Sequence, residues 1–319
     1  MTAMNGEIFT HSSRENCSTS SAKFDGDYRW TSIFNSLESV GLENNQISSI
    51  HPKAFAASKK IKLLNLYSNH LHYLPNNVFK YIPRLQFLLL GLNQILNINT
   101  YTFAGLESLT DLDMPMNNLS KLPSNAFQNL PKLKILDLAM NKIASISTQA
   151  FTGLEELDFL NLAGNMLTDI QESTFASLKK LEMLVLDNNE LESLTAGMLV
   201  GLKNLRELYV SNNRLKELPR NTFKHVPRLT KLALNSNHLK SIDGEALTHF
   251  VCPVCTELSM AYLHGNPLVC DCKLTSLLQW LSSSQVKAFP GAVLRCWEPA
   301  EHRGKELKSL QRSQLKCLA

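Results

Sequence analysis

The chain repeats one residue pattern every 24 positions, nine times in succession. Each repeat has the form L-x-x-L-x-L-x-x-N-x-L-x-x-L-x-x-x-x-F-x-x-L-x-x, and the repeats begin at Leu37, Ile61, Leu85, Leu109, Leu133, Leu157, Leu181, Leu205 and Leu229. A strict period of this length is typical of a solenoid, in which each repeat buries its apolar side chains against its neighbours. A solenoid displays a large surface, so the functional question is what that surface binds.

The positions within each repeat predict its local structure. The segment L-x-x-L-x-L alternates between inward and outward residues, which is the pattern of a short strand. Nine such strands side by side predict an α/β horseshoe with a parallel sheet on its concave face. The ninth residue of every repeat is Asn. We interpret this column as structural, because an amide at a tight inward turn satisfies backbone groups that would otherwise be buried without partners.

Charge and hydropathy narrow the classes of function. The net charge of the chain is +4, and all of it is contributed by residues 287–319. Such a basic end suits a polyanion such as heparin, although a solvated cap surface is the more common role of a charge run. No nucleic-acid-binding motif accompanies the charge. The sequence has no apolar run of 18 or more residues, so we expect no membrane span.

Four of the seven cysteines form a C-x-C…C…C set after a degenerate tenth repeat: Cys270, Cys272, Cys296 and Cys317. The segment KLTSLLQWLSSS follows Cys272 and carries leucines at helical spacing. A terminal repeat would expose the edge of its core to water, so we predict a capping helix held by disulfides. The sequence alone allows three pairings of four cysteines.

The segments NPLVCDCKLTSLLQWL, RCWEP and LKC resemble the cysteine-rich C-terminal cap of extracellular leucine-rich-repeat proteins. The repeat with LPxxxF is also the type found in that family, which includes variable lymphocyte receptors, Toll-like receptor ectodomains, Slit-type proteins and plasma leucine-rich glycoproteins. The resemblance covers residues 37–317. It implies a secreted protein or a receptor ectodomain, with the disulfides Cys270–Cys296 and Cys272–Cys317.

Both ends of the chain depart from the family pattern. The family usually opens with a four-cysteine cap, whereas only Cys17 precedes the first repeat and no signal peptide is visible in residues 1–13. We therefore expect a truncated N-terminus. The segment before Cys296 is also shorter than the loop that lymphocyte receptors often carry. We divide the chain into a degenerate N-terminal segment (1–36), nine repeats (37–252), a tenth repeat with an insertion (253–268) and the cap (269–319).

Two further cysteines, Cys252 and Cys255, form a C-x-x-C motif in that insertion. We favour a local disulfide or two free thiols. The alternative is a four-thiolate zinc site shared with Cys270 and Cys272, which conflicts with the cap's need for its own bridges. We therefore predict no metal and no cofactor.

The outward positions of the strands carry the information about binding, because burial does not dictate them. Asp111, Asp113 and Asp137 are predicted to lie about 5–7 Å apart on adjacent strands. Apolar and aromatic residues surround them, which favours an interaction site over simple packing of large side chains against each other. The predicted ligand-binding residues are Tyr67, Phe87, Leu89, Asp111, Asp113, Ile135, Asp137, Phe159, Met183, Asp187 and Tyr209.

Paired carboxylates also suit hydrolysis or metal binding. An open sheet excludes little water and no His is adjacent, so we predict that the chain is not an enzyme. We expect an extracellular, immune-receptor-like protein that binds protein or bacterial-surface ligands on its concave face. The alternatives are a matrix, adhesion or guidance module and a non-catalytic scaffold subunit. An exposed apolar face is also compatible with a homodimer. In a secreted chain, Asn118 and Asn16 are predicted N-glycosylation sites.

Overall fold

The computed structural model describes residues 37–248, 258–283 and 293–317. The chain divides into two compact units, Met1–Asn161 and Leu162–Ala319. Asn16, Cys17, Cys252 and Cys255 lie outside the described residues.

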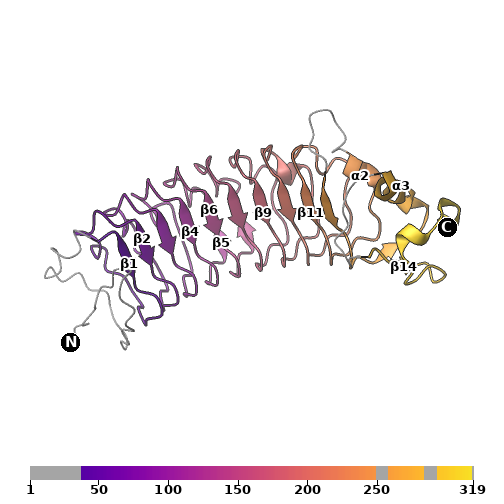
Figure 1. The fold of residues 1–319 in the computed structure, drawn as a ribbon. Helices are drawn as coiled ribbons and strands as arrows, with labels where there is room; N and C mark the ends of the chain where they lie inside the picture. Colours follow the sequence, from indigo (N-terminus) through magenta and orange to yellow (C-terminus); the bar gives the residue numbers. More distant parts are fainter. Residues whose placement is uncertain (1–36, 249–257, 284–292, 318–319) are drawn as a thin grey trace. The chain divides into compact units, whose positions relative to one another are not determined.

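The first unit contains a sheet of short parallel strands, one for each repeat (Figure 1). They are β1 (Ser39–Gly41), β2 (Leu63–Asn65), β3 (Phe87–Leu89), β4 (Asp111–Asp113), β6 (Ile135–Asp137) and β8 (Phe159–Asn161). Each residue pairs with the residue 24 positions further on, as Leu88 pairs with Leu112 and Leu112 with Leu136. The middle residue of each strand is buried and its two neighbours point outward, which confirms the alternation predicted from the sequence.

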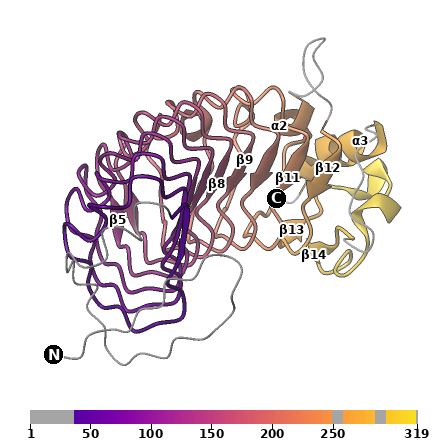
Figure 2. The same ribbon diagram turned by 60° about the vertical axis from the view of Figure 1, so that its left-hand side comes forward.

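Stacked apolar side chains fill the interior of this unit, and Figure 2 shows its successive turns one behind another. The leucines of the repeat are almost fully buried. A column of phenylalanines forms a second part of the core, with ring centroids 5.9 Å apart between Phe103 and Phe127 and 6.2 Å apart between Phe127 and Phe151. A second small sheet pairs β5 (Lys121–Leu122) with β7 (Ser145–Ile146).

The asparagine column links consecutive turns through hydrogen bonds. Asn117 Oδ1 accepts from the backbone N–H of Ile95 at 2.9 Å, and Asn117 Nδ2 donates to the carbonyl oxygens of Leu90 and Met114 at 3.0 and 3.2 Å. The same three kinds of contact occur at Asn69, Asn93, Asn141, Asn189, Asn213, Asn237 and Asn266. Each amide satisfies backbone groups in a buried turn, so the predicted structural role is confirmed.

The second unit continues the same pattern of strands. Its parallel sheet contains β9 (Met183–Val185), β10 (Glu207–Tyr209), β11 (Lys231–Ala233) and β12 (Met260–Tyr262). The insertion before the tenth repeat lengthens the step between paired residues, since Lys231 pairs with Met260, but the strands remain parallel. The short 3-10 helix η2 (Gly197–Leu199) and helix α2 (Gly244–Thr248) precede β10 and β12.

A disulfide-bonded cap ends the second unit. It contains β13 (Leu268–Val269), η3 (Cys272–Leu274), α3 (Thr275–Ser283), β14 (Cys296–Glu298), η4 (Leu307–Ser309) and η5 (Arg312–Gln314). The disulfides join Cys270 to Cys296 and Cys272 to Cys317, which are the pairs implied by the family resemblance. Cys270 and Cys272 are therefore not available as thiolates for the zinc alternative.

Helix α3 lies where the leucine spacing predicted a capping helix, and it buries Leu277 and Leu278. It packs closely on the start of α2, where a Cβ on Gly244 would lie 2.2 Å from the carbonyl oxygen of Ser276. Ser276 Oγ accepts from the backbone N–H of Gly244 at 2.9 Å and donates to Asp243 Oδ1 at 3.1 Å. A side chain larger than hydrogen at position 244 would separate the cap helix from the last repeats.

Candidate functional site

The candidate site is the sheet face of the first unit, which we define as the outward residues of β2, β3, β4, β6 and β8 and the residue two positions after each of β2, β3, β4 and β6. Eight of the predicted binding residues lie on it: Tyr67, Phe87, Leu89, Asp111, Asp113, Ile135, Asp137 and Phe159. Phe87 and Ile135 are 40% and 41% exposed, and the other six are half-buried. Large apolar groups therefore remain in water on this face.

The strand register fixes how the three carboxylates are arranged. Asp113 lies directly across from Leu89 on one side and Asp137 on the other. Asp111 lies across from Phe87 and Ile135, so it stands two residues away from the Asp113–Asp137 pair. Adjacent parallel strands are about 4.8 Å apart, which places two carboxylates side by side and the third on the diagonal.

Asp137 is held by two hydrogen bonds. Its Oδ1 accepts from the backbone N–H of Ala139 at 2.8 Å, and its Oδ2 accepts from Asn161 Nδ2 at 3.2 Å. Asn65 makes the first of these contacts in its own repeat, since its Oδ1 accepts from the N–H of Tyr67 at 3.0 Å. The fifth residue of a repeat thus tends to accept a hydrogen bond from the N–H of the seventh.

Asp113 occupies the same fifth position but has no such donor. The seventh residue of its repeat is Pro115, which carries no backbone N–H. Asp113 Oδ1 is buried without a hydrogen-bond partner among the described residues. Burial and the neighbouring Asp137 carboxylate raise the pKa of Asp113 from 3.8 to about 6. The site therefore contains one carboxyl group that the protein itself leaves unsatisfied.

Gly91 makes room for this carboxyl group. A Cβ on Gly91 would lie 2.8 Å from Tyr67 Cε2 and 2.9 Å from Asp113 Oδ1. The Tyr67 ring and the Asp113 carboxyl group thus converge over the same glycine from the turns on either side. An aromatic ring beside a carboxylate is an arrangement that suits a cation.

A row of exposed apolar residues borders the face at the carboxyl ends of its strands, and sequence reasoning missed it. We call Leu92, Met116 and Met140 the αL row, because their φ angles are 51°, 54° and 54°. Their exposed fractions are 41%, 40% and 56%. Leu92 N–H donates to the carbonyl oxygen of Pro115 at 3.0 Å, and Met116 N–H to that of Ala139 at 2.9 Å, so the three residues follow one another on consecutive turns.

Every other repeat has Asn, Ser or Gly at this eighth position, namely Asn44, Ser68, Gly164, Asn188, Asn212 and Ser236, all with positive φ. A bulky apolar residue is unfavourable in left-handed backbone, whereas Gly and Asn tolerate it. Apolar residues at this position in three consecutive repeats thus cost the fold free energy, and their side chains are exposed to water. The signal was present in the sequence as a break in the residue type at the eighth position.

The predicted residues of the second unit form a different kind of surface. Tyr209 Oη donates to Glu207 Oε2, and Lys231 Nζ lies 4.9 Å from the centroid of the Tyr209 ring and 3.6 Å from Glu207 Oε2. Asp187 Oδ1 accepts from the N–H of Ser211 at 2.6 Å. Burial raises the pKa of Asp187, against the effect of the hydrogen bonds from Ser211.

Met183, the third predicted residue of this unit, is half-buried on β9. The polar groups of Tyr209 and Asp187 are satisfied by their own neighbours. Sequence reasoning did not include Glu207 and Lys231, because charged residues on strands gave no sign that they would pair around a tyrosine. The polar groups of this surface are therefore less available to a partner than the Asp113 carboxyl group on the face of the first unit.

The arrangement gives little support for metal or acid–base chemistry. No group of three or more His, Cys, Asp or Glu side chains is placed to hold a metal ion within residues 37–248, 258–283 and 293–317. The Asp113–Asp137 pair lies on an open sheet, where water is not excluded. What the pair does well is accept hydrogen bonds from positively charged donors.

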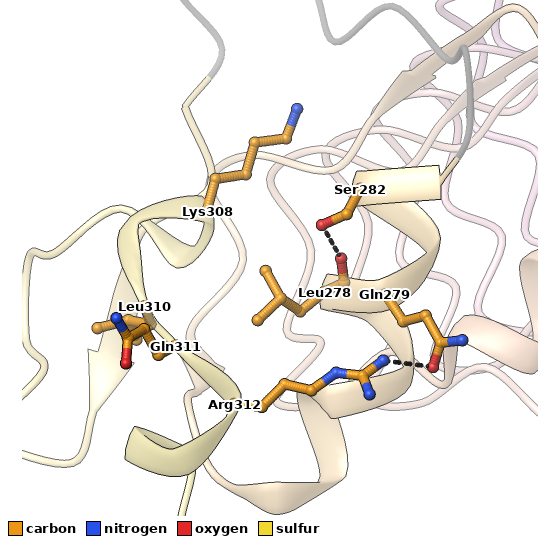
Figure 3. A pocket seen from close by; sticks show the side chains of 7 residues that line it. All are labelled: Leu278, Gln279, Ser282, Lys308, Leu310, Gln311 and Arg312. Carbon is orange, nitrogen blue, oxygen red and sulfur yellow. Dashed lines mark hydrogen bonds between the residues drawn. The ribbon is translucent and has the colours of Figure 1, made fainter.

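The cap carries a separate cavity of about 490 Å³, lined by Leu278, Gln279, Ser282, Lys308, Leu310, Gln311 and Arg312. Figure 3 shows the side chains of Lys308 and Arg312 on either side of Leu278. Arg312 Nη2 donates to Gln279 Oε1 at 2.6 Å, which leaves its other N–H donors for a ligand. No acidic residue lines this cavity.

The Leucine rich repeat family model matches residues 35–95, 109–167, 162–215 and 203–268. These segments cover more than half of the chain, which therefore belongs to the leucine-rich repeat family. The two disulfides of its C-terminal region fit the cysteine-rich cap of extracellular members of the family. In the parts of the chain that the structure describes, no helix has both the length and the apolar character to cross a bilayer.

Individual relatives are distant. Phospholipase A2 inhibitor beta from Elaphe climacophora is 34% identical over 53 residues, which are 17% of this chain and only 16% of that protein. A chain from the octameric complex of Latrophilin 3, Unc5D and FLRT2 has a TM-score of 0.69 at 24% identity, covering 89% of this chain and 92% of its own. Human 5T4, a trophoblast glycoprotein, has a TM-score of 0.61 at 25% identity, covering 79% and 93%.

Proposed function

We propose that this chain is an extracellular, non-catalytic recognition protein that binds a protein partner through the sheet face of its first unit. The observation that carries the proposal is the exposure of Phe87 and Ile135 at one border of this face and of the αL row at the other. Exposed apolar groups gathered on a rigid sheet are typical of interaction sites. The disulfide-bonded cap supports an oxidising, extracellular location.

The comparisons support binding rather than catalysis. Leucine-rich repeat ectodomains are typically interaction modules, and one of the similar structures is a complex of several proteins. An immune-receptor-like role, with protein or bacterial-surface ligands, is the finer form of this proposal. The partner class also includes a second copy of the chain, because an apolar face can pair with itself.

A binding screen with a matched pair of variants tests the proposal. The full chain is tetramerised and applied to an array of secreted and cell-surface proteins, to whole bacteria and to itself. Phe87→Ser with Ile135→Ser removes apolar groups from the face, whereas Tyr73→Ser with Tyr101→Ser removes rings that are 56% and 59% exposed elsewhere. Thermal unfolding confirms that both variants are folded.

We expect binding that is lost in the Phe87/Ile135 variant and retained in the Tyr73/Tyr101 variant. Binding that survives the Phe87/Ile135 variant would place the interaction elsewhere. An empty screen that includes the self-association arm would count against a recognition function.

A second candidate function is polyanion binding at the cap, as in a matrix or adhesion module. The observation that favours this function is the cavity of the cap, which contains Lys308 and Arg312 among its lining residues and no acidic side chain. Heparin chromatography tests it with Lys308→Gln/Arg312→Gln, against the control Lys59→Gln/Lys60→Gln, which removes the same charge in the first unit. Earlier elution of the cap variant alone supports this function, and equal elution of the two variants contradicts it.

A further inference from the structure

We infer that the partner element bound by the sheet face of the first unit presents a lysine or arginine side chain, flanked by apolar groups, to the carboxylates of Asp113 and Asp137. This inference rests on the proposed function and names the chemistry of the partner. The occupant is therefore a protein segment with one central positive charge.

Charge complementarity is the first support. The outward and αL positions of four successive repeats lie within residues 63–68, 87–92, 111–116 and 135–140, and none of these segments contains Lys, Arg or His. No ion pair among the described residues involves Asp111, Asp113 or Asp137. The face thus has three carboxylates and no internal cation. In contrast, Glu207 of the second unit has Lys231 at 3.6 Å.

The hydrogen-bonding of the pair locates the charge. Both oxygens of Asp137 accept hydrogen bonds from the protein. Asp113 receives none from the described residues, because Pro115 stands where a donor would be. Asp113 Oδ1 is buried beside the Tyr67 ring, so Oδ2 is the oxygen that a partner reaches. A cation at Oδ2 gives the Asp113 carboxyl group a charged hydrogen-bond donor and relieves the repulsion between the two carboxylates.

The groups around the carboxylates define what flanks the cation. Phe87 and Ile135 stand toward the beginning of the strands, and the αL row stands beyond their ends. The Asp113–Asp137 pair lies between these two apolar borders in the order of the chain. The Tyr67 ring adds an aromatic surface on which a guanidinium or ammonium group can rest. A basic residue between leucine-like residues matches this order of groups.

Two small peptides test the inference on the full chain. Acetyl-Leu-Arg-Leu-amide carries the proposed charge, and acetyl-Leu-citrulline-Leu-amide is its uncharged counterpart. Affinities are measured by NMR titration at neutral pH for the wild type, for Asp113→Asn and for Asp169→Asn, which removes the same charge at an exposed position of the second unit.

We expect the wild type and Asp169→Asn to prefer the arginine peptide by about tenfold or more, the effect of a hydrogen bond to a charged group. Asp113→Asn should abolish most of that preference. The double variant Met116→Asn/Met140→Asn should lower the affinity for both peptides equally, because it removes apolar contacts and leaves the carboxylates in place. Equal behaviour of the two peptides on the wild type, including no binding of either at the highest soluble concentration, would overturn the inference.

This result is separable from the proposed function. If the protein screen finds a partner that is lost in the Phe87/Ile135 variant but binds Asp113→Asn as tightly as the wild type, the face binds proteins without a central cation. If the arginine preference holds while the screen is empty, the cation site stands and the proposed function fails.

Discussion

Pro115 deprives Asp113 of the backbone hydrogen bond that the same strand position receives in the next repeat. There, Ala139 donates its N–H to Asp137 Oδ1 at 2.8 Å. The two repeats otherwise have the same local backbone pattern, and their strands pair residue for residue. Because the proline ring removes the backbone N–H, the Asp113 carboxyl group lacks the hydrogen bond that Asp137 receives.

Asp113→Asn should change how stability depends on pH. The folded-state pKa of Asp113 is raised to about 6, so between about pH 4 and 6 the folded state binds more protons than the unfolded state. The free energy of unfolding of the wild type should therefore fall as the pH rises through this window. The variant lacks that loss and should gain about 1 kcal/mol over the wild type at pH 7.5, after discounting for solvent screening, and little at pH 4.

Thermal unfolding of both proteins at the two pH values checks this prediction. A stability difference between variant and wild type that is the same at pH 4 and pH 7.5 would contradict the raised pKa of Asp113.

Pro115→Ala should restore the missing donor. The new N–H has the position from which Ala139 serves Asp137, so it should lower the pKa of Asp113. Carboxyl carbon NMR shifts of Asp113, followed during a pH titration, measure the change directly. Ala139→Gly is the matched control, because it keeps the N–H at its position, and it should leave the titration of Asp113 where it is in the wild type. An unchanged midpoint in Pro115→Ala would show that burial and the Asp137 carboxylate set the pKa of Asp113, whether or not the backbone donor is present.

Met116→Asn should stabilise the fold while weakening binding. The φ of 54° disfavours methionine but suits asparagine, which other repeats use at this position. We expect a gain of about 0.5–1 kcal/mol in the free energy of unfolding. Met166→Asn is the control, since Met166 is 49% exposed but is not among the positive-φ residues. A gain of equal size in the control would mean that loss of exposed apolar surface, rather than backbone strain, is responsible.

Asn117→Ala should destabilise the protein by about 2–4 kcal/mol, because it leaves the buried N–H of Ile95 without its acceptor and removes the three contacts that Asn117 Nδ2 donates to carbonyl oxygens. Denaturant unfolding measures the loss. Asn97→Ala, at an exposed position of the preceding repeat, should change the free energy of unfolding by less than about 0.5 kcal/mol. Similar losses in the two variants would contradict the bridging role of the column.

Secretory expression should attach a glycan at Asn118. The sequon is Asn118-Leu119-Ser120, and the Asn118 side chain is half-buried at the border of the αL row. Peptide mass spectrometry should find a modification that peptide N-glycosidase removes and that Asn118→Gln lacks. An unmodified Asn118 in a chain that has passed through the secretory pathway would rule out a glycan at this border.

The repeat pattern predicted most of the fold because its apolar residues do almost nothing except pack. Leu112 is fully buried in the middle of its strand, and a residue type at a fixed period is enough to predict that. The cap helix was likewise predictable from leucines at helical spacing. The sequence did not reveal how the insertion before the tenth repeat would affect strand pairing. In the structure β12 still pairs in parallel with β11, with Lys231 opposite Met260.

The site was predicted less completely, for reasons that depend on particular residues. Asp113 and Asp137 were indistinguishable as carboxylates on neighbouring strands, and only the bond from Ala139 shows that they differ. Met116 was not assigned to the site, because its left-handed backbone is a property of the turn rather than of methionine. Tyr209 was assigned to the site as a free aromatic group, but Glu207 and Lys231 engage it.

The spacing of the αL row has a consequence for the length of any ligand. Its residues follow one another at the step between parallel strands, about 4.8 Å. A helical ligand advances about 5.4 Å per turn and an extended one about 6.8 Å per pair of residues. A straight ligand therefore falls out of phase with the row, by about 0.6 Å per repeat if it is helical and by about 2 Å per repeat if it is extended. Specific contact is thereby confined to a short footprint, however many repeats the solenoid contains.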